Sequence, residues 1–270
     1  MSYGTGWKAD DVIVKGDLEV DRYSSAKPLP SKCVEMGEFL GGRTLNALPV
    51  LDQSQTSTCV SQSVTEVIYA RLAQVGDNPV IIDTQKAYAM AQRWEQNRRR
   101  KKSPLVDGGL HPVDMVLMLS KWGVNTIAAP YAPRDLDAHV LDDVWVADYQ
   151  RAATHAVNGW RRIADDLEPA EIVEAAKQYL AAGFPGFDGA DLDAGFMNYS
   201  GGVWTRDPNA KSRGLHATAI VGYDDDRQAF LRVNSWSSGW GDRGFYWQSY
   251  ATYGDSLFVA DRYFLDATHT

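Results

Sequence analysis

The sequence has few cysteines, no long apolar run and no excess of positive charge. Its 270 residues include two cysteines, Cys33 and Cys59, so a disulfide-stapled framework is excluded. No apolar stretch approaches the roughly 20 residues that a membrane-spanning helix needs. The formal net charge of −8 argues against a globally basic nucleic-acid-binding protein. We therefore expect a globular protein that binds neither membrane nor nucleic acid.

Signals for secretion and for metal binding are also missing. The N-terminus has no basic start followed by an apolar stretch, so we see no signal peptide and expect a cytoplasmic protein. Both cysteines are then expected to be thiols. We expect no metal or other cofactor, because the histidines apart from His216 show no metal-ligand spacing. We interpret them as surface or capping residues: His111, His139, His155 and His269.

One basic run, residues 98–102, stands out against the acidic balance. It follows a predicted helix, and we interpret it as a solvated loop. A local patch for phosphate or an acidic partner is the alternative.

The chain divides into a polar N-terminal extension, residues 1–44, and one domain, residues 45–270. A short strand at 11–14 is the main structure that we expect in the extension. Apolar spacing predicts four helices in the domain: from near Ser57 to Gly76, after Asp83, from His111 to Lys121, and over 169–182. Residues 130–165 are consistent with two more short helices.

Strand patterns come later in the domain, at 217–221, 229–233 and 244–247. Helices followed by strands are typical of an α+β fold. We expect a helical lobe that faces an antiparallel β lobe.

Cys59 lies at the predicted start of the first long helix, where backbone N–H groups favour a thiolate. Alone, it would most often be a small buried apolar side chain. However, Gln53 precedes it by six residues, and His216 and Asn234 follow it in that order. A histidine can take the proton of a thiol, and a third polar group can hold the ring in the required tautomer. The pattern therefore predicts a Cys-His-Asn nucleophilic site.

Each of these residues also has an ordinary structural role. His216 could be a hydrogen-bonded histidine at a strand start, Asn234 could belong to a turn, and Trp236 could be a core aromatic. It is improbable that all of these residues have only structural roles and still occur together in this order.

Two blocks of sequence resemble the papain-like cysteine peptidases. Residues 214–223 resemble the histidine strand of that family, and residues 234–245 resemble its Asn-Ser-Trp…Gly-Trp-Gly…Gly signature. Residues 107–109 resemble its glycine-pair segment, and Pro130-Tyr131 resembles its Pro-Tyr pair. The resemblance covers about residues 47–265 and implies a two-lobed papain-like fold with the active-site cleft between the lobes.

The resemblance also implies roles for the catalytic residues. Cys59 would attack the scissile carbonyl, His216 would act as base and acid, and Asn234 would orient the imidazole. Trp236 would cover the His-Asn bond, and the Gln53 amide with the Cys59 N–H would form the oxyanion hole.

Substrate contacts are implied in the same way. Gly108 and Gly109 would pair with the main chain of a protein or peptide substrate, and Ala217 would line the S2 pocket. No cofactor or metal is implied.

The sequence departs from the family around the nucleophile, where secreted members have Cys-Gly-Ser-Cys-Trp and this chain has residues 56–60, Thr-Ser-Thr-Cys-Val. The missing upstream cysteine removes a disulfide, and Ser57 replaces a glycine, so its β-carbon could narrow the S1 side. Leu215 stands where plant members often carry an acid.

Two other functions remain open. One is a weakly active or inactive papain-fold component that binds or assembles, for example in a phage virion, which would make the protein virion-associated. The other is a thiol acyl transferase, because transfer and hydrolysis use the same thiolate. The extension is a candidate contact for an assembly partner, and we also hypothesise that it occludes the cleft.

Overall fold

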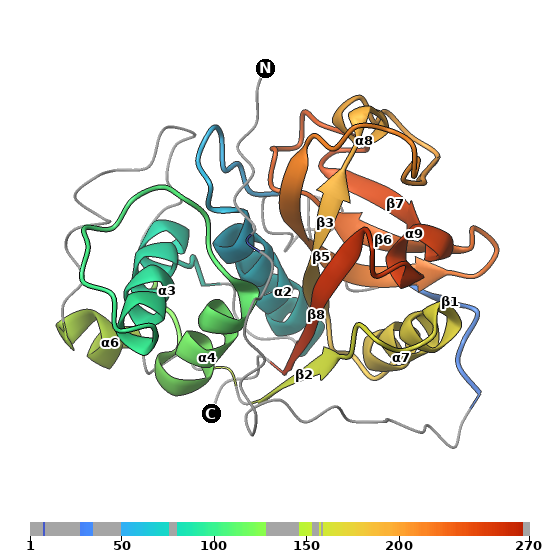
Figure 1. The fold of residues 1–270 in the computed structure, drawn as a ribbon. Coiled ribbons are helices and arrows are strands. Elements are labelled where there is room, and N and C mark those ends of the chain that lie inside the picture. The colour runs from blue at the N-terminus through green and yellow to red at the C-terminus, as the bar shows by residue number, and fades with distance from the viewer. Residues whose placement is uncertain are drawn as a thin grey trace.

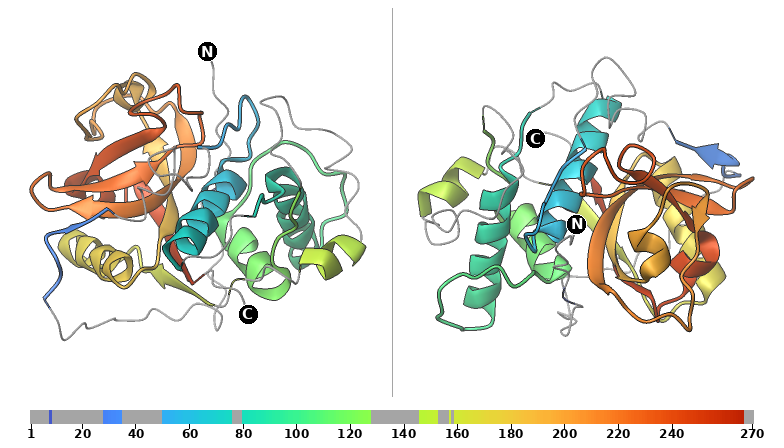
Figure 2. Two further views of the ribbon diagram at one scale, coloured as in Figure 1. Left: turned by 180° about the vertical axis from the view of Figure 1, so that it is seen from behind. Right: turned by 90° about the horizontal axis from the view of Figure 1, so that it is seen from above.

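The computed structural model describes residues 8, 28–34, 50–75, 80–127, 146–152, 157 and 159–266. Within these residues, helices α2, α3, α4 and α6 gather on one side, and a sheet occupies the other (Figure 1). The same division is seen from behind (Figure 2). The order of elements agrees with the expected α+β class.

The helical lobe consists of helices close to their predicted positions: α2 Cys59–Val75, α3 Thr84–Arg98, α4 Pro112–Trp122 and the short α6 Val146–Ala152. Asp83 caps α3, because its side chain accepts a hydrogen bond from the Lys86 N–H. Helix α4 has its proline at the first turn and ends at Gly123, whose φ of 74° suits glycine. Local signals in the sequence thus set the start of α3 and both ends of α4.

The β lobe is an eight-stranded sheet in the order β2-β8-β3-β5-β6-β7-β4, with β1 paired to β5. Its strands are β1 Lys32–Cys33, β2 Gly159–Ile163, β3 Gly186–Leu192, β4 Val203–Trp204, β5 Gly214–Asp224, β6 Ala229–Val233, β7 Phe245–Ser249 and β8 Val259–Asp266. Strands β4 and β7 run parallel. The sheet is therefore mostly, rather than wholly, antiparallel.

Three further helices accompany the sheet: α7 Pro169–Ala181, α8 Ala194–Met197 and α9 Tyr250–Gly254. Helix α7 begins with the predicted proline and packs against β5, β2 and α9.

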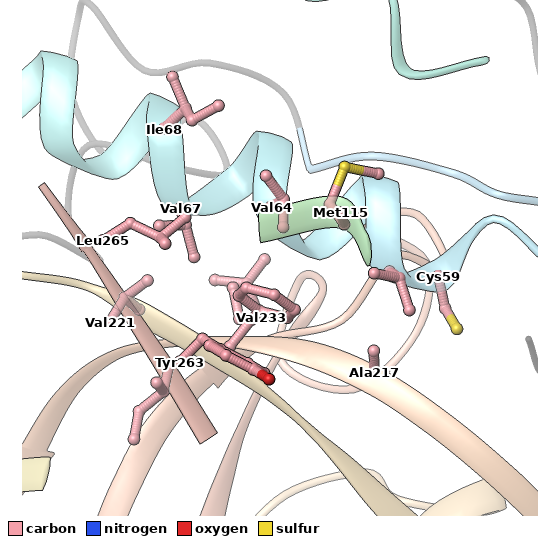
Figure 3. Packing of buried hydrophobic residues seen from close by; sticks show 14 of the residues in the cluster. Cys59, Val64, Val67, Ile68, Met115, Ala217, Val221, Val233, Tyr263 and Leu265 are labelled. Atoms are coloured by element: carbon pink, nitrogen blue, oxygen red, sulfur yellow. The ribbon is translucent and has the colours of Figure 1, made fainter. Parts of the chain in front are cut away.

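Helix α2 joins the two lobes, because its apolar face packs against the sheet (Figure 3). Val64 and Val67 face the sheet residues Val221, Val233 and Leu265 in the buried core. Each buried aliphatic side chain of this size contributes about 1.5–3 kcal/mol. This packing fixes the N-terminal end of α2, and so Cys59, relative to β5.

In its described part, the segment 130–165 contains one helix, α6, followed by strand β2. Residues 130–145 lie outside the described residues, so the second short helix stays a prediction. Residues 28–34 of the extension are part of the fold, because β1 pairs with β5 and Tyr223 Oη donates to Pro30 O at 2.7 Å. Gly222 permits this pairing, since a β-carbon there would clash with Cys33 O. Residues 11–14, Pro130-Tyr131, His139, His155 and His269 lie outside the described residues.

Candidate active site

The structure brings His216 and Asn234 into contact from neighbouring parts of the sheet. His216 lies on β5, Asn234 directly follows β6, and the two side chains share a 2.7 Å hydrogen bond between Nε2 and Oδ1. With Oδ1 as acceptor, Nε2 carries the proton, and Nδ1 keeps its lone pair. Nδ1 is buried and makes no hydrogen bond to any described residue. The imidazole is therefore in the tautomer that can accept a proton at Nδ1.

Aromatic side chains enclose this pair. Trp236 stacks on His216 with ring centroids 4.8 Å apart, and Phe196 contacts both rings edge-on. Burial lowers the pKa of His216 to about 4, while the Asn234 hydrogen bond raises it and the Arg232 guanidinium lowers it further. The imidazole is neutral at pH 7 unless a negative charge forms beside it.

Gln53 is fixed to the loop that carries Asn234. Its Oε1 accepts a 2.6 Å hydrogen bond from Ser235 Oγ, and its Nε2 donates to Thr56 O at 2.8 Å. The Gln53 N–H also donates to Ser235 O at 2.9 Å, and Asp52 forms a bridge with Trp236. These contacts tie the segment before α2 to the segment after β6.

Cys59 is the first residue of α2 and is fully buried. Figure 3 shows its side chain over β5 near Ala217, the neighbour of His216. The chain's two cysteines form no disulfide with each other. In place of the upstream cysteine, Thr56 donates from Oγ1 to Gln53 O at 2.6 Å and contacts Thr58 Oγ1 at 2.7 Å. Hydrogen bonds thus shape the loop that a disulfide braces in secreted members.

The glycine-pair segment lies against the same loop. The Ser57 N–H donates to both Asp107 carboxylate oxygens, at 2.8 and 3.1 Å. The Gly109 N–H donates to Tyr88 Oη at 2.9 Å, and Gln92 Nε2 donates to Val106 O at 2.8 Å. The structure therefore brings the glycine segment next to the start of α2. Gly108 is exposed, whereas Gly109 and Ala217 are buried.

Sequence reasoning missed a charged pair behind the histidine. Arg232 donates to Asp188 Oδ1 at 2.7 Å, and both side chains are fully buried. Arg232 also donates to Thr218 O at 2.8 Å. Arg232 lies two residues before Asn234, and its partner Thr218 lies two residues after His216. Because side chains two residues apart share a sheet face, the Arg232–Asp188 pair lies on the same face as the His216–Asn234 pair. The available signal was a single arginine within the otherwise apolar strand 229–233.

The structure also tests the predictions for His111 and for the basic run 98–102. His111 is the N-cap residue of α4, in line with the capping interpretation, although its side chain makes no cap hydrogen bond. It is buried rather than at the surface, and its Nε2 lies 3.5 Å from Glu95 Oε1. The basic run is partly paired, because Arg98 contacts Asp114 and Arg99 contacts Glu95, whereas Lys101 and Lys102 are exposed.

Within the described residues, no three side chains form a metal-binding group, and no helix is long and apolar enough to cross a membrane.

A model of the papain family of cysteine proteases matches residues 43–256. The chain therefore belongs to the papain family.

Solved structures agree on the fold. Xylellain, a cysteine protease from Xylella fastidiosa, matches with a TM-score of 0.77 and 21% identity, over 99% of this chain and 97% of that one. Procathepsin L 3 from the larval midgut of Tenebrio molitor matches with a TM-score of 0.67 and 19% identity, over 97% of this chain and 75% of that one. Procathepsin B S9 from Trypanosoma congolense has a TM-score of 0.69 and 14% identity, over 98% and 87%. No curated protein sequence matches the chain. The fold is thus papain-like.

Proposed function

We propose that the protein is a cysteine peptidase that hydrolyses peptide bonds in protein or peptide substrates through an acyl-enzyme on Cys59. The observation that carries this proposal is the buried His216–Asn234 bond, which leaves His216 Nδ1 with a lone pair. In a protein of this family, that nitrogen would take the proton of the Cys59 thiol.

The proposed reaction proceeds in two halves. The Cys59 sulfur attacks the scissile carbonyl carbon, and the carbonyl oxygen becomes an oxyanion that accepts from the Gln53 amide and the Cys59 N–H. The protonated His216 then gives its proton to the leaving amine, and a thioester remains. Water, deprotonated by His216, attacks the thioester and releases the carboxylate product and the thiolate.

The low pKa of His216 is compatible with this chemistry. Burial penalises an imidazolium alone, but a thiolate formed beside it favours the charged ring. Asn234 Oδ1 accepts a hydrogen bond from the His216 Nε2–H in both states, so the ring keeps its orientation during the transfer.

A second candidate is a papain-fold component that binds a partner without turnover. It is favoured by the burial of both Cys59 and His216, which leaves neither side chain open to solvent. The N-terminal extension, of which Lys8 donates from its N–H to Leu110 O at 3.1 Å, would then contact the assembly partner.

Incubation with denatured casein and a peptide mixture, with the products identified by mass spectrometry, tests the proposal. We expect cleavage by the wild type and by Cys33→Ala, and none by Cys59→Ala. Adding an amine nucleophile separates hydrolysis from acyl transfer, because a transferase would give amide products. Intact peptides after long incubation with the wild type would support the binding component.

A further inference from the structure

An exposed carboxylate lies at the junction between the nucleophile loop and the glycine-pair segment. Asp107 reaches across to residue 57 and accepts the Ser57 N–H with both oxygens, at 2.8 and 3.1 Å. Asp107 is exposed to solvent, although it binds within two residues of Cys59. The resemblance to the papain family gives no role to this side chain.

Helix α3 holds the carboxylate in place. Tyr88 Oη donates to Asp107 Oδ1 at 3.3 Å and accepts from the Gly109 N–H and from Gln92 Nε2, each at 2.9 Å. Gln92 Nε2 also donates to Val106 O at 2.8 Å. The residues on both sides of Asp107 are thus anchored to one buried tyrosine and one buried glutamine. Burial, and then the Asp107 charge, raises the pKa of Tyr88, so the phenol stays protonated.

The negative charge of Asp107 has no basic partner in the described part of the chain. In the basic run that precedes Asp107, Arg98 pairs with Asp114 and Arg99 with Glu95. A charge in this position, exposed and anchored, is available to a ligand in the cleft.

We propose that Asp107 determines specificity by selecting a lysine or arginine at P1, the residue on the amino side of the scissile bond. This inference rests on the proposed function. In a bound substrate, the scissile carbonyl carbon would lie at Cys59 and the preceding main chain would pair with Gly108. The P1 residue is the one residue between these two contacts. A residue spans at most about 3.6 Å, so the P1 side chain must pass Ser57 and the Asp107 carboxylate.

The interaction is an exposed ion pair, so its effect is limited. Such pairs are worth about 0.2–1 kcal/mol, which corresponds to a preference of up to about fivefold. Ser57 carries a β-carbon where the family resemblance implies a glycine, and this β-carbon would favour the slim stems of lysine and arginine over branched side chains. Added salt screens the interaction.

The test uses the full chain and two peptides that differ only at P1, arginine in one and its uncharged isostere citrulline in the other. For the wild type, we expect kcat/KM to favour arginine by about two- to fivefold, and less at 0.5 M salt. Asp107→Asn keeps an acceptor for the Ser57 N–H and should bring the ratio close to one. Asp107→Glu keeps the charge and should retain the preference. Equal rates in the wild type, or an undiminished ratio in Asp107→Asn, would overturn the inference.

Binding of the same two peptides to Cys59→Ala, measured by fluorescence anisotropy, gives the preference without turnover. The inference is supported if Cys59→Ala binds the arginine peptide more tightly and Cys59→Ala/Asp107→Asn loses this preference. This holds even if the wild type cleaves no peptide, because absence of cleavage would refute only the proposed function. Equal binding of the two peptides, or none, counts against the role of Asp107.

Discussion

The buried pair of Arg232 and Asp188 offers a prediction with a large expected effect. Asp188→Asn leaves the Arg232 guanidinium charged and fully buried among neutral acceptors: the new amide oxygen, Thr218 O and Gln248 Oε1. Loss of one partner of a buried ion pair costs about 3–5 kcal/mol. Since domains unfold with about 5–15 kcal/mol in total, this substitution should remove a large share of the stability.

Replacing both members should cost far less. In Asp188→Leu/Arg232→Met neither charge is buried, and apolar replacements of buried ion pairs are often neutral or stabilising by about 1–4 kcal/mol. Burial raises the pKa of Asp188, and the Arg232 guanidinium opposes this, so the arginine favours the charged form of the buried carboxylate.

Urea unfolding at pH 7 measures these free energies for the wild type, Asp188→Asn, the singles Asp188→Leu and Arg232→Met, and the double variant. In thermal unfolding of the same proteins, we expect Asp188→Asn to lower Tm by roughly 6–20 °C, and the double variant to recover most of the loss. A loss below about 1 kcal/mol in the single variant, or a double variant as unstable as the sum of the singles, would refute the reasoning.

Three further predictions concern the site and its surroundings. Burial raises the pKa of Glu66 from 4.5 to about 8, and the hydrogen bond from the Leu51 N–H opposes this rise. The wild-type folded state therefore loses stability as pH rises from 4.5 to 8. In urea unfolding, the stability of Glu66→Gln relative to the wild type should increase over this range, by a few kcal/mol at most. A pH-independent difference would contradict the assignment. Ser235→Ala removes the hydroxyl that donates to Gln53 Oε1 at 2.6 Å. This variant should lower kcat about tenfold with little change in KM, because loss of a whole oxyanion donor costs roughly 10²–10³-fold. An unchanged kcat would show that this hydrogen bond does not position the Gln53 amide. Deletion of residues 1–26, which keeps β1, should raise peptide turnover if the extension occludes the cleft, and equal kcat/KM in the two chains would reject that hypothesis.

Local signals in the sequence predicted the helices well. Asp83, Pro112, Gly123 and Pro169 mark helix ends through capping and backbone preference, and each does so in the structure. These signals act within a few residues, so one sequence is sufficient to recognise them.

Strand β3 was not predicted, because its sequence lacks the usual pattern of a strand. The segment 186–192 contains two glycines and two aspartates, which are rare in strands. Asp188 is accommodated only because Arg232, from a distant segment, neutralises it. Long-range pairing of this kind overrides local propensity and leaves no local signal.

For the candidate site, the motif blocks predicted the contact between His216 and Asn234 but not how the surrounding segments are held. The contact of His216 with Asn234 was expected from the order of the residues. The Ser235–Gln53 bond and the Asp107–Ser57 contact join segments far apart in the chain, so they required the structure.

The central claim is that His216 activates Cys59, and the rate of iodoacetamide labelling across pH tests it most directly. Peptide mass spectrometry follows Cys59, with Cys33 in the same molecule as the reference thiol. An ordinary thiol labels in proportion to its thiolate and slows below its pKa of about 8.5. We predict that Cys59 keeps its labelling rate down to about pH 5–6 and that His216→Ala restores the ordinary profile. A Cys59 profile that matches an ordinary thiol in the wild type, or no labelling at any pH, would contradict the account.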